Sequence, residues 1–392
     1  MIKWINFLHF YQPPTAQDNT TKQITKQCYQ PLVDFLFKYK NIKITINISS
    51  CLTDRLFNLG YKKLLKDFSK LAECGQIEFV SSAAFHSILP LLPEKEIIKQ
   101  IKINNEINKK HFGTGYNPKG FFLPEMAYTA KIGQIIKKLG FKYIILDQIA
   151  YNKSLKSEID NNIKYKTPYG LLVVFRNRKI SQTFVPETIL SLLKQDSLKK
   201  QTTIITATDS ELYGHRYWNW RPNYSELIKN KNIKTLTMSE YLNTIKIIKT
   251  IKPKKSSWES TKKELNAHIP FALWDNPKNA IHKKLWQLAK FALKLNYSNE
   301  KDINHFASRL HLEKGLASCT FWWASKKDFK LFSPQAWDPS MVEKGAHELL
   351  NSIRSLNKLA NSNKLHAEKL FSEIRNLVWK KHWKTNEKKH EK

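Results

Sequence analysis

Arginine is scarce in this chain of 392 residues, although the formal net charge is +33. Only eight of the 66 basic residues are arginines, and the lysines that make up the rest are scattered among isoleucines and asparagines. Phosphate and base recognition favours the forked guanidinium of arginine, whereas these lysines recur on the polar faces of the expected helices. The composition therefore favours a solvated, lysine-rich surface over a specific nucleic-acid site, with only weak, nonspecific binding to polyanions.

The chain also has few cysteines and no long apolar run. The four cysteines are dispersed and form no Cys-x-x-Cys pair, which suits reduced thiols in a cytosol better than a disulfide framework. A run of about eighteen apolar residues, the length expected of a membrane-spanning helix, is missing. Residues 1–9 alternate like a strand and are interrupted too soon for a signal peptide. We therefore expect a cytoplasmic protein that makes no membrane contact.

The first 250 residues alternate short apolar runs with longer amphipathic ones. The expected strands are 2–8, 42–48, 76–81, 120–123, 143–146, 171–175, 203–207 and 235–238. The expected helices are 24–39, 53–73, 94–112, 129–138, 186–193 and 239–249. Strands separated by segments long enough for crossovers indicate parallel pairing in a barrel-like α/β domain, and a doubly wound open sheet is the competing architecture.

The pattern changes after a basic linker at 249–255. From Ala280 onward the apolar residues recur at helical spacing, which predicts a bundle of helices. We therefore expect a barrel domain over 1–250, a helical domain over 256–380 that contributes to the active-site cleft, and a frayed basic tail over 381–392. The sequence shows no internal repeat.

Two acids stand at the ends of expected strands. Glu125 follows the strand 120–123 and a proline, and Asp209 follows the strand 203–207. In an α/β barrel the carboxyl ends of the strands converge on one mouth, so two acids there suggest acid/base or glycosidic chemistry. Each acid also has a structural explanation, because Glu125 could be an ion-pair partner and Asp209 could cap the following helix.

Several motifs resemble those of glycoside hydrolase family 57 and occur in that family's order. They are His-Phe-Tyr-Gln-Pro-Pro at 9–14, Cys-Gly-Gln-Ile-Glu at 74–78, Phe-Leu-Pro-Glu at 122–125, Asp-Ser-Glu-Leu-Tyr-Gly-His at 209–215 and a weaker match at 311–323. The resemblance implies an incomplete seven-stranded (β/α) barrel followed by a C-terminal helical domain. It also implies a retaining mechanism on α-glucans, in a family that includes α-amylases, 4-α-glucanotransferases, branching enzymes and a few α-galactosidases.

By motif position, the resemblance makes Glu125 the nucleophile and Asp209 the general acid/base. It places His9, Glu78 and Glu211 along the sugar subsite, although His9 could also be a core histidine and Glu211 a support for Asp209. The further candidates for substrate binding are Gln12, His86, His215, Trp218, Trp322 and Trp323. Indole rings pack well on the C–H faces of sugars, but tryptophans at helical spacing are more often core residues. No metal or cofactor is expected.

The chemistry of acetal cleavage suits these residue types. The leaving oxygen must be protonated and the transition state carries positive charge, so Glu125 must be ionised while Asp209 holds a proton. Once the sugar has esterified Glu125, Asp209 can accept the proton of an incoming hydroxyl. Whether that hydroxyl belongs to water or to a second sugar decides between hydrolysis and transfer, and the motifs leave this choice open.

Three positions depart from the family pattern. Phe122 stands where a tryptophan is common, Cys319 where an aspartate is common and Tyr11 where a second histidine is frequent. Binding without turnover, as in a glucan-binding module, is therefore one alternative. A metal-dependent polysaccharide deacetylase is another, although none of the twelve histidines has a second histidine four residues away. A nucleic-acid binder ranks last, because no motif for it is present.

Overall fold

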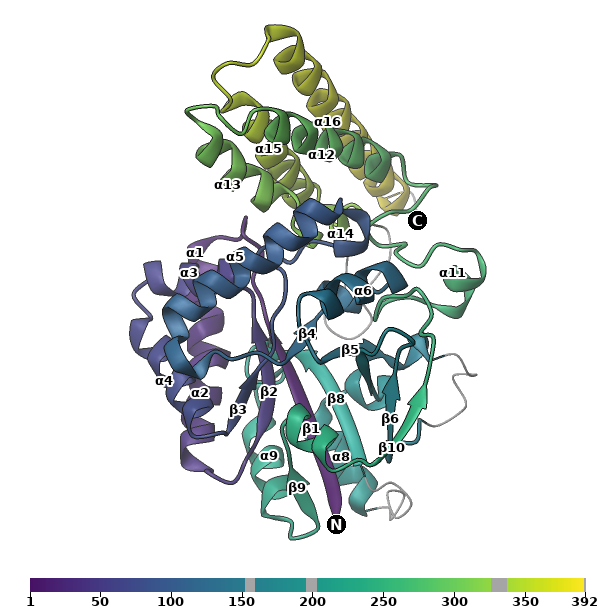
Figure 1. Cartoon of the computed structure of the whole chain (residues 1–392). Coiled ribbons are helices and arrows are strands. Elements are labelled where there is room, and N and C mark those ends of the chain that lie inside the picture. The colour runs from purple at the N-terminus through teal and green to yellow at the C-terminus, as the bar shows by residue number, and fades with distance from the viewer. Residues whose placement is uncertain (152–158, 195–202, 326–336, 391–392) are drawn as a thin grey trace. The chain divides into compact units, whose positions relative to one another are not determined.

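The computed structural model describes residues 1–151, 159–194, 203–325 and 337–390 (Figure 1). The chain divides into two compact units. The first comprises Met1–Gln12 and Ala16–Lys262, and the second comprises Pro13–Thr15 and Lys263–Lys392.

Parallel strands form the wall of the first unit (Figure 1). They are β1 (Ile2–Phe10), β2 (Ile44–Ile48), β3 (Ile77–Phe79), β4 (Gly120–Phe122), β5 (Tyr143–Asp147), β7 (Leu172–Arg176) and β8 (Thr203–Asp209). One sheet has the order β3, β2, β1, β8, and a second sheet contains β7, β5 and β4 in adjacent positions. Each of these strands is rich in Val, Ile or Phe or buried along most of its length, as expected where helices cover the outside of a parallel sheet.

Backbone hydrogen bonds at two seams join the sheets into a ring. At the seam between β3 and β4, Ser81 N donates to Gly120 O at 3.0 Å and Phe122 N donates to Ser81 O at 2.8 Å. At the seam between β7 and β8, Asn177 N donates to Ile205 O at 2.7 Å. The ring is thus an incomplete seven-stranded barrel with two weakly paired seams, which confirms the predicted fold.

The interior of the barrel below the ends of the strands is mostly apolar, with Thr45 and Glu78 among its polar residues. The buried side chains that meet there come from β1, β4, β5, β7 and β8 and from the residue after β3, and they include Phe7, Val80, Phe122, Ile145, Val174 and Ala207. Because alternate residues of a strand point to the same face, His9 and Asp209 lie one layer above Phe7 and Ala207. His9 and Asp209 therefore lie at the mouth of the barrel, one layer beyond the apolar side chains of its interior.

The structure differs from the sequence-based expectation in the last part of this unit. The expected strand 235–238 is β9 (Ile233–Thr235), which pairs with β1, and a capping box at Thr237 starts helix α10 (Met238–Asn243). The expected helix 239–249 was therefore wrong beyond Asn243. Residues Ile247–Thr250 instead form the exposed strand β10, which pairs with β6 (Ile163–Lys166), a strand that the sequence did not indicate.

The helices of the first unit largely follow the expected spans. Helix α5 (Glu94–Phe112) matches its expected bounds, and α6 (Ala130–Lys138) begins after its cap Thr129. The expected helix 53–73 is two helices, because Gly60 has a φ of +90° between them. The remaining helices are α1 (Asp18–Ile24), a π-helical turn (Thr25–Tyr29), α2 (Gln30–Lys38), α3 (Ser50–Asn58), α4 (Lys62–Glu73), α7 (Arg178–Ser181), α8 (Val185–Lys194) and α9 (Trp220–Lys229).

The second unit is helical, as the apolar spacing predicted. Its helices are α11 (beginning at Lys262 and ending at Asn266), α12 (Ala280–Ser298), α13 (His305–Gly315), α14 (Ser318–Trp322), α15 (Pro339–Arg354) and α16 (Asn361–His390). Leu285, Leu349 and Ile353 are among its fully buried residues. Helix α16 continues to His390, through most of the tail that we expected to be frayed. None of the described helices is long and apolar enough to cross a membrane.

Candidate active site

His9 and Asp209 are neighbours at the mouth of the barrel. They face each other in the register between β1 and β8, and the Nδ1 atom of His9 is 2.8 Å from Asn47 Oδ1 on β2. Burial lowers the pKa of His9, and the charge of Asp209 acts in the opposite direction. His9 is therefore held as a neutral, oriented imidazole whose buried Nε2 has no hydrogen-bond partner among the described residues.

Glu125 is held in an unusual backbone conformation just after β4. A single 3-10 turn, Pro124–Met126, follows the strand, and Glu125 has a φ of +58° in the left-handed region that side chains rarely adopt. Its Oε2 accepts a hydrogen bond of 2.7 Å from Trp258 Nε1, and its carbonyl oxygen accepts one of 3.0 Å from Trp258 N. Strain of this kind persists where surrounding contacts impose it, and here Trp258 supplies two of them.

His86 connects the two acids through a stack of rings. Its Nδ1 is 3.7 Å from Glu125 Oε1, and its ring lies on His9 with the centroids 4.6 Å apart and on Tyr11 at 4.2 Å. Burial lowers the pKa of His86 well below its usual value, and neighbouring His9 lowers it further. The structure thus joins Glu125, His86 and His9 in one connected cluster, and Asp209 stands beside His9 at the end of β8.

Gln12 and Glu211 lie beside this cluster. Glu211 follows β8 in a 3-10 turn, and its Oε1 accepts hydrogen bonds from Gln12 Nε2 at 2.6 Å and from Tyr29 OH at 3.1 Å. Burial and, after it, the nearby charge of Asp209 together raise the pKa of Glu211 to about 7, although the positive charge of Arg216 acts in the opposite direction. Glu211 therefore changes its charge close to neutral pH, directly next to the second candidate acid.

Glu78 does not join the cluster. It pairs with Thr45 in the register between β2 and β3, one layer below the level of His9. Its carboxylate accepts hydrogen bonds from Tyr143 OH at 2.7 Å, from Ser239 N at 2.8 Å and from the Ser239 hydroxyl. These contacts give Glu78 a role in anchoring the start of α10 inside the barrel, and its expected place in the sugar subsite stays a prediction.

The other expected binding residues are His215 and Trp218, which follow β8, and Trp322 and Trp323, which belong to the second unit. His215 Nδ1 is 2.7 Å from Gln27 Oε1, and burial together with the charge of Arg216 lowers the pKa of His215. Trp218, in the loop after β8, is 86% exposed, which is unusual for an indole ring. Trp322 and Trp323 belong to the helical unit, where their rings meet edge to face at 4.3 Å. Their contribution to the cleft stays a prediction.

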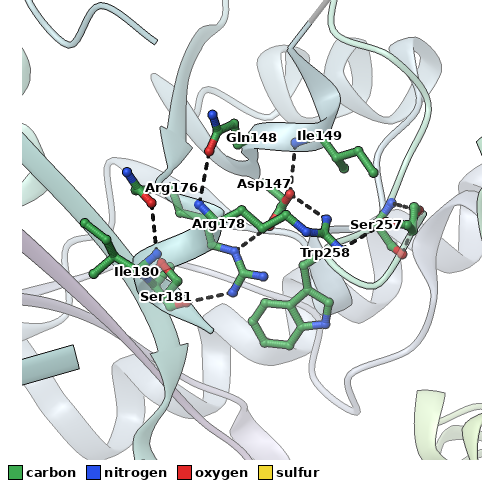
Figure 2. Close-up of polar contacts among 12 residues, drawn as sticks. Asp147, Gln148, Ile149, Arg176, Arg178, Ile180, Ser181, Ser257 and Trp258 are labelled. Carbon is green, nitrogen blue, oxygen red and sulfur yellow. Dashed lines mark hydrogen bonds and ion pairs between the residues drawn. The ribbon is translucent and has the colours of Figure 1, made fainter. Parts of the chain in front are cut away.

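Sequence reasoning missed a buried ionic group that borders the site (Figure 2). Arg176 Nε donates to Asp147 Oδ2 at 2.6 Å, and Arg178 Nη1 donates to Asp147 Oδ1 at 2.8 Å. Asp147 and Arg176 end β5 and β7, so the strand-end rule that selected Glu125 also applies to them. Trp258 lies in a loop after the linker, and no local sequence signal marks it as the donor to Glu125.

No set of three or more His, Cys, Asp or Glu side chains in the described ranges is arranged to hold a metal ion. The polar groups at the mouth are instead suited to bind hydroxyl groups and to transfer protons. They comprise an ionisable carboxyl at the end of each of two strands, neutral imidazoles and buried amide and phenol donors.

Known proteins resemble this chain in sequence. The family model of Glycosyl hydrolase family 57 matches residues 4–256. The chain is 28% identical over 227 residues to Alpha-amylase 1 of Dictyoglomus thermophilum, a match covering 56% of this chain and 32% of that protein. It is 22% identical over 262 residues to the 4-alpha-glucanotransferase of Thermococcus litoralis, covering 62% of this chain and 38% of that one. The chain therefore spans about a third of the length of these curated relatives.

Solved structures share the fold along nearly the whole chain. A GH57 branching enzyme from Thermococcus kodakaraensis aligns with a TM-score of 0.70 at 15% identity, over 96% of this chain and 95% of that one. An α-amylase from Thermotoga maritima aligns with a TM-score of 0.64 at 16% identity, over 96% of this chain and 99% of that one. These likenesses establish the architecture of an α/β barrel with a helical part that follows it.

Proposed function

We propose that this chain, which belongs to glycosyl hydrolase family 57, is a retaining glycosidase or transglycosidase that acts on α-glucans. The observation that carries the proposal is the cluster at the barrel mouth, where His9 and His86 link Asp209 to Glu125. Two carboxyl groups on one mouth are the minimum that double displacement at a sugar carbon needs. The relatives named an α-amylase and a 4-alpha-glucanotransferase support the substrate class.

In the first step Glu125 acts as the nucleophile. Its carboxylate attacks the anomeric carbon while Asp209 gives its proton to the departing glycosidic oxygen, which leaves a glycosyl ester on Glu125. The hydrogen bond from Trp258 Nε1 stabilises the ionised form of Glu125 before the attack, because a donor to a carboxylate favours its charge. The Nδ1 atom of His86 lies 3.7 Å from the other carboxylate oxygen of Glu125.

In the second step Asp209, now ionised, takes a proton from an incoming hydroxyl group. The oxygen attacks the anomeric carbon from the side that the first leaving group occupied, the ester bond to Glu125 breaks, and the configuration is retained. Water as the acceptor gives hydrolysis, and a sugar hydroxyl gives transfer or branching. The exposed indole of Trp218 is our candidate for holding an acceptor sugar, since it offers an open face to stack on.

The polar groups around the acids are the proposed sugar contacts. His9 presents a neutral Nε2, and Gln12 and Glu211 form a fixed hydrogen-bonded pair beside Asp209. A substrate hydroxyl that reaches these groups finds donors and acceptors already oriented by Asn47 and Tyr29. Preorganised polar groups of this kind lower the barrier because they need no rearrangement during the reaction.

Incubation with maltooligosaccharides of defined length tests the proposal. Products that are only shorter indicate hydrolysis, products both longer and shorter indicate transfer, and new branch points indicate a branching activity. Tight binding of a maltooligosaccharide without any product would instead favour a glucan-binding module, which the departures at Phe122 and Cys319 make a real alternative. Stoichiometric bound metal together with release of acetate from an acetylated oligosaccharide would favour the deacetylase alternative.

We also propose a cytoplasmic location. The four cysteines are dispersed along the chain and form no Cys-x-x-Cys pair, as expected of a protein kept in a reducing compartment. An α-glucan is the expected partner, and neither a specific nucleic acid nor a membrane is.

A further inference from the structure

We propose that Arg176 is a positioning residue that sets the geometry of both catalytic carboxyls. The inference rests on the proposed roles of Glu125 and Asp209 and adds a third, buried component to them. Arg176 contacts neither acid directly in this scheme. It acts on Glu125 through Trp258 and on Asp209 through the backbone of β8.

Arg176 is itself firmly anchored (Figure 2). Its Nε donates to Asp147 Oδ2 at 2.6 Å, and the side chains of Arg176 and Asp147 are 5% and 1% exposed. The other oxygen of Asp147 accepts hydrogen bonds from Arg178 Nη1 at 2.8 Å and from Ile149 N at 2.9 Å. A buried carboxylate with this many donors fixes the guanidinium in one orientation, because any rotation would leave charged groups without partners.

The first connection of Arg176 reaches the strand that ends in Asp209. Arg176 Nη1 donates to Ala207 O at 2.8 Å, and Ala207 stands two residues before Asp209 on β8. This bond crosses the seam between β7 and β8, beside the backbone bond from Asn177 N to Ile205 O. The side chain thus supplies pairing that the two backbones do not complete, and it fixes the height of the carboxyl end of β8 against β7.

The second connection reaches Glu125. The guanidinium carbon of Arg176 lies 5.0 Å from the centroid of the Trp258 ring, within the range of a cation–π contact. The same indole donates from Nε1 to Glu125 Oε2 at 2.7 Å, and Trp258 is only 8% exposed. Because the cation covers the indole face, it holds the ring plane from which the N–H points at the carboxylate.

The guanidinium of Arg176 therefore contacts both β8, which carries Asp209, and Trp258, which donates to Glu125. If it is removed, Trp258 loses the group that fixes its plane and β8 loses a bond two residues from its catalytic end. A displacement of about 1 Å between reacting groups can lower the rate about a hundredfold, whereas binding by the remaining sugar contacts is affected far less. We therefore expect a loss in kcat rather than a rise in KM.

Arg178 provides a matched control. It donates to the same carboxylate, Asp147, but its second hydrogen bond goes to Ser260 O at 3.0 Å, and neither of these bonds reaches β8 or Trp258. If Arg176 only stabilises the fold through Asp147, replacing Arg178 should lower kcat as much as replacing Arg176 does. If Arg176 positions the two acids, only its replacement should lower kcat strongly.

The experiment compares Arg176→Met, Arg178→Met and Trp258→Phe with the wild-type chain, using a maltooligosaccharide of defined length. We expect Arg176→Met to lower kcat about a hundredfold with KM within about twofold, and Arg178→Met to lower kcat less than about threefold. In Arg176→Met and Trp258→Phe the acidic limb of kcat/KM should move to higher pH, because Glu125 has lost or loosened a donor to its charged form. Circular dichroism and a thermal midpoint confirm that each variant is folded, and Arg176→Lys serves in place of Arg176→Met if that variant is not.

Equal losses in the Arg176 and Arg178 variants, or an acidic limb that stays in place when Arg176 is replaced, would overturn the inference. Failure of the underlying function looks different. In that case the wild-type chain itself forms no product, or Glu125→Gln leaves product formation intact.

Discussion

Replacing Glu211 by glutamine should make the folded chain more stable at alkaline pH. The hydrogen bonds that Gln12 and Tyr29 donate to the Glu211 carboxyl both end on Oε1, so the oxygen of an amide can accept them unchanged. The substitution therefore keeps these two hydrogen bonds and removes the ionisation. This makes Glu211→Gln a test of the electrostatic argument rather than of packing.

The size of the effect follows from the raised pKa of Glu211. The carboxyl ionises at its usual pKa of 4.5 in the unfolded chain and at about 7 in the folded one. Between these values the unfolded chain binds fewer protons, so the free energy of unfolding falls as the pH rises through this window and is constant above it. A difference of about 2.5 in pKa corresponds to about 3 kcal/mol of free energy of unfolding. The wild type loses this stability as the pH rises through the window, and Glu211→Gln does not.

Urea unfolding at pH 5 and pH 8, followed by tryptophan fluorescence, measures this difference. Relative to the wild type, Glu211→Gln should gain about 2 to 3 kcal/mol on going from the lower to the higher pH. Glu226→Gln is the control, because Glu226 is 55% exposed beside Lys194, and it should show no such gain. If the stability difference between Glu211→Gln and the wild type is the same at both pH values, folding does not raise the pKa of the Glu211 carboxyl.

Three further outcomes follow from the structure. Glu125→Gln should abolish turnover of maltooligosaccharides while leaving the thermal midpoint near that of the wild type, and Asp209→Asn should slow substrates with poor leaving groups far more than activated aryl glycosides. These outcomes are checked by steady-state rates on both substrate types, and near-normal cleavage by Glu125→Gln would remove the assignment. Gly214→Ala should destabilise the first unit by more than about 1 kcal/mol, because its φ is +128° and a Cβ would lie 2.0 Å from a backbone oxygen. Gly140→Ala, at a φ of +92° with no atom within 4 Å, separates the cost of backbone strain from that of the clash in the same unfolding assay. Phe122→Trp should lower the free energy of unfolding by about 1–3 kcal/mol, because Phe122 is fully buried in the barrel. An unchanged unfolding midpoint would show that the interior has room for the larger ring.

Periodicity predicted the parts of the fold that depend on a single element. Helix α5 has a buried stripe along one face and ends at Gly113, whose φ of +53° stops the helix, so both of its ends were visible in the sequence. The strand ends that carry Glu125 and Asp209 were equally visible, because an apolar run followed by an acid is a local pattern. The order of these elements then made a barrel the expected arrangement.

Strand β10 could not be predicted from periodicity. Its residues, Ile247–Thr250, are all exposed, and they read as the continuation of an amphipathic helix. What makes them a strand is the hydrogen-bonding edge of β6, more than eighty residues earlier in the chain. A strand defined by its partner rather than by its own burial leaves no periodic signal.

The donor to Glu125 illustrates the same limit within the site itself. Phe122 appeared to remove an indole from the neighbourhood of the nucleophile, because a tryptophan is common at that position in the family. In the structure Phe122 packs on Phe7 inside the barrel, with the ring centroids 5.0 Å apart, and an indole N–H nevertheless reaches the carboxylate. This N–H belongs to Trp258, which lies 133 residues after Glu125 in the chain. Arg176 fixes the plane of the Trp258 ring. A departure in one motif therefore cannot be weighed from that motif alone, because what Glu125 needs is a donor at the right place, and the fold can deliver it from any segment that reaches the barrel mouth.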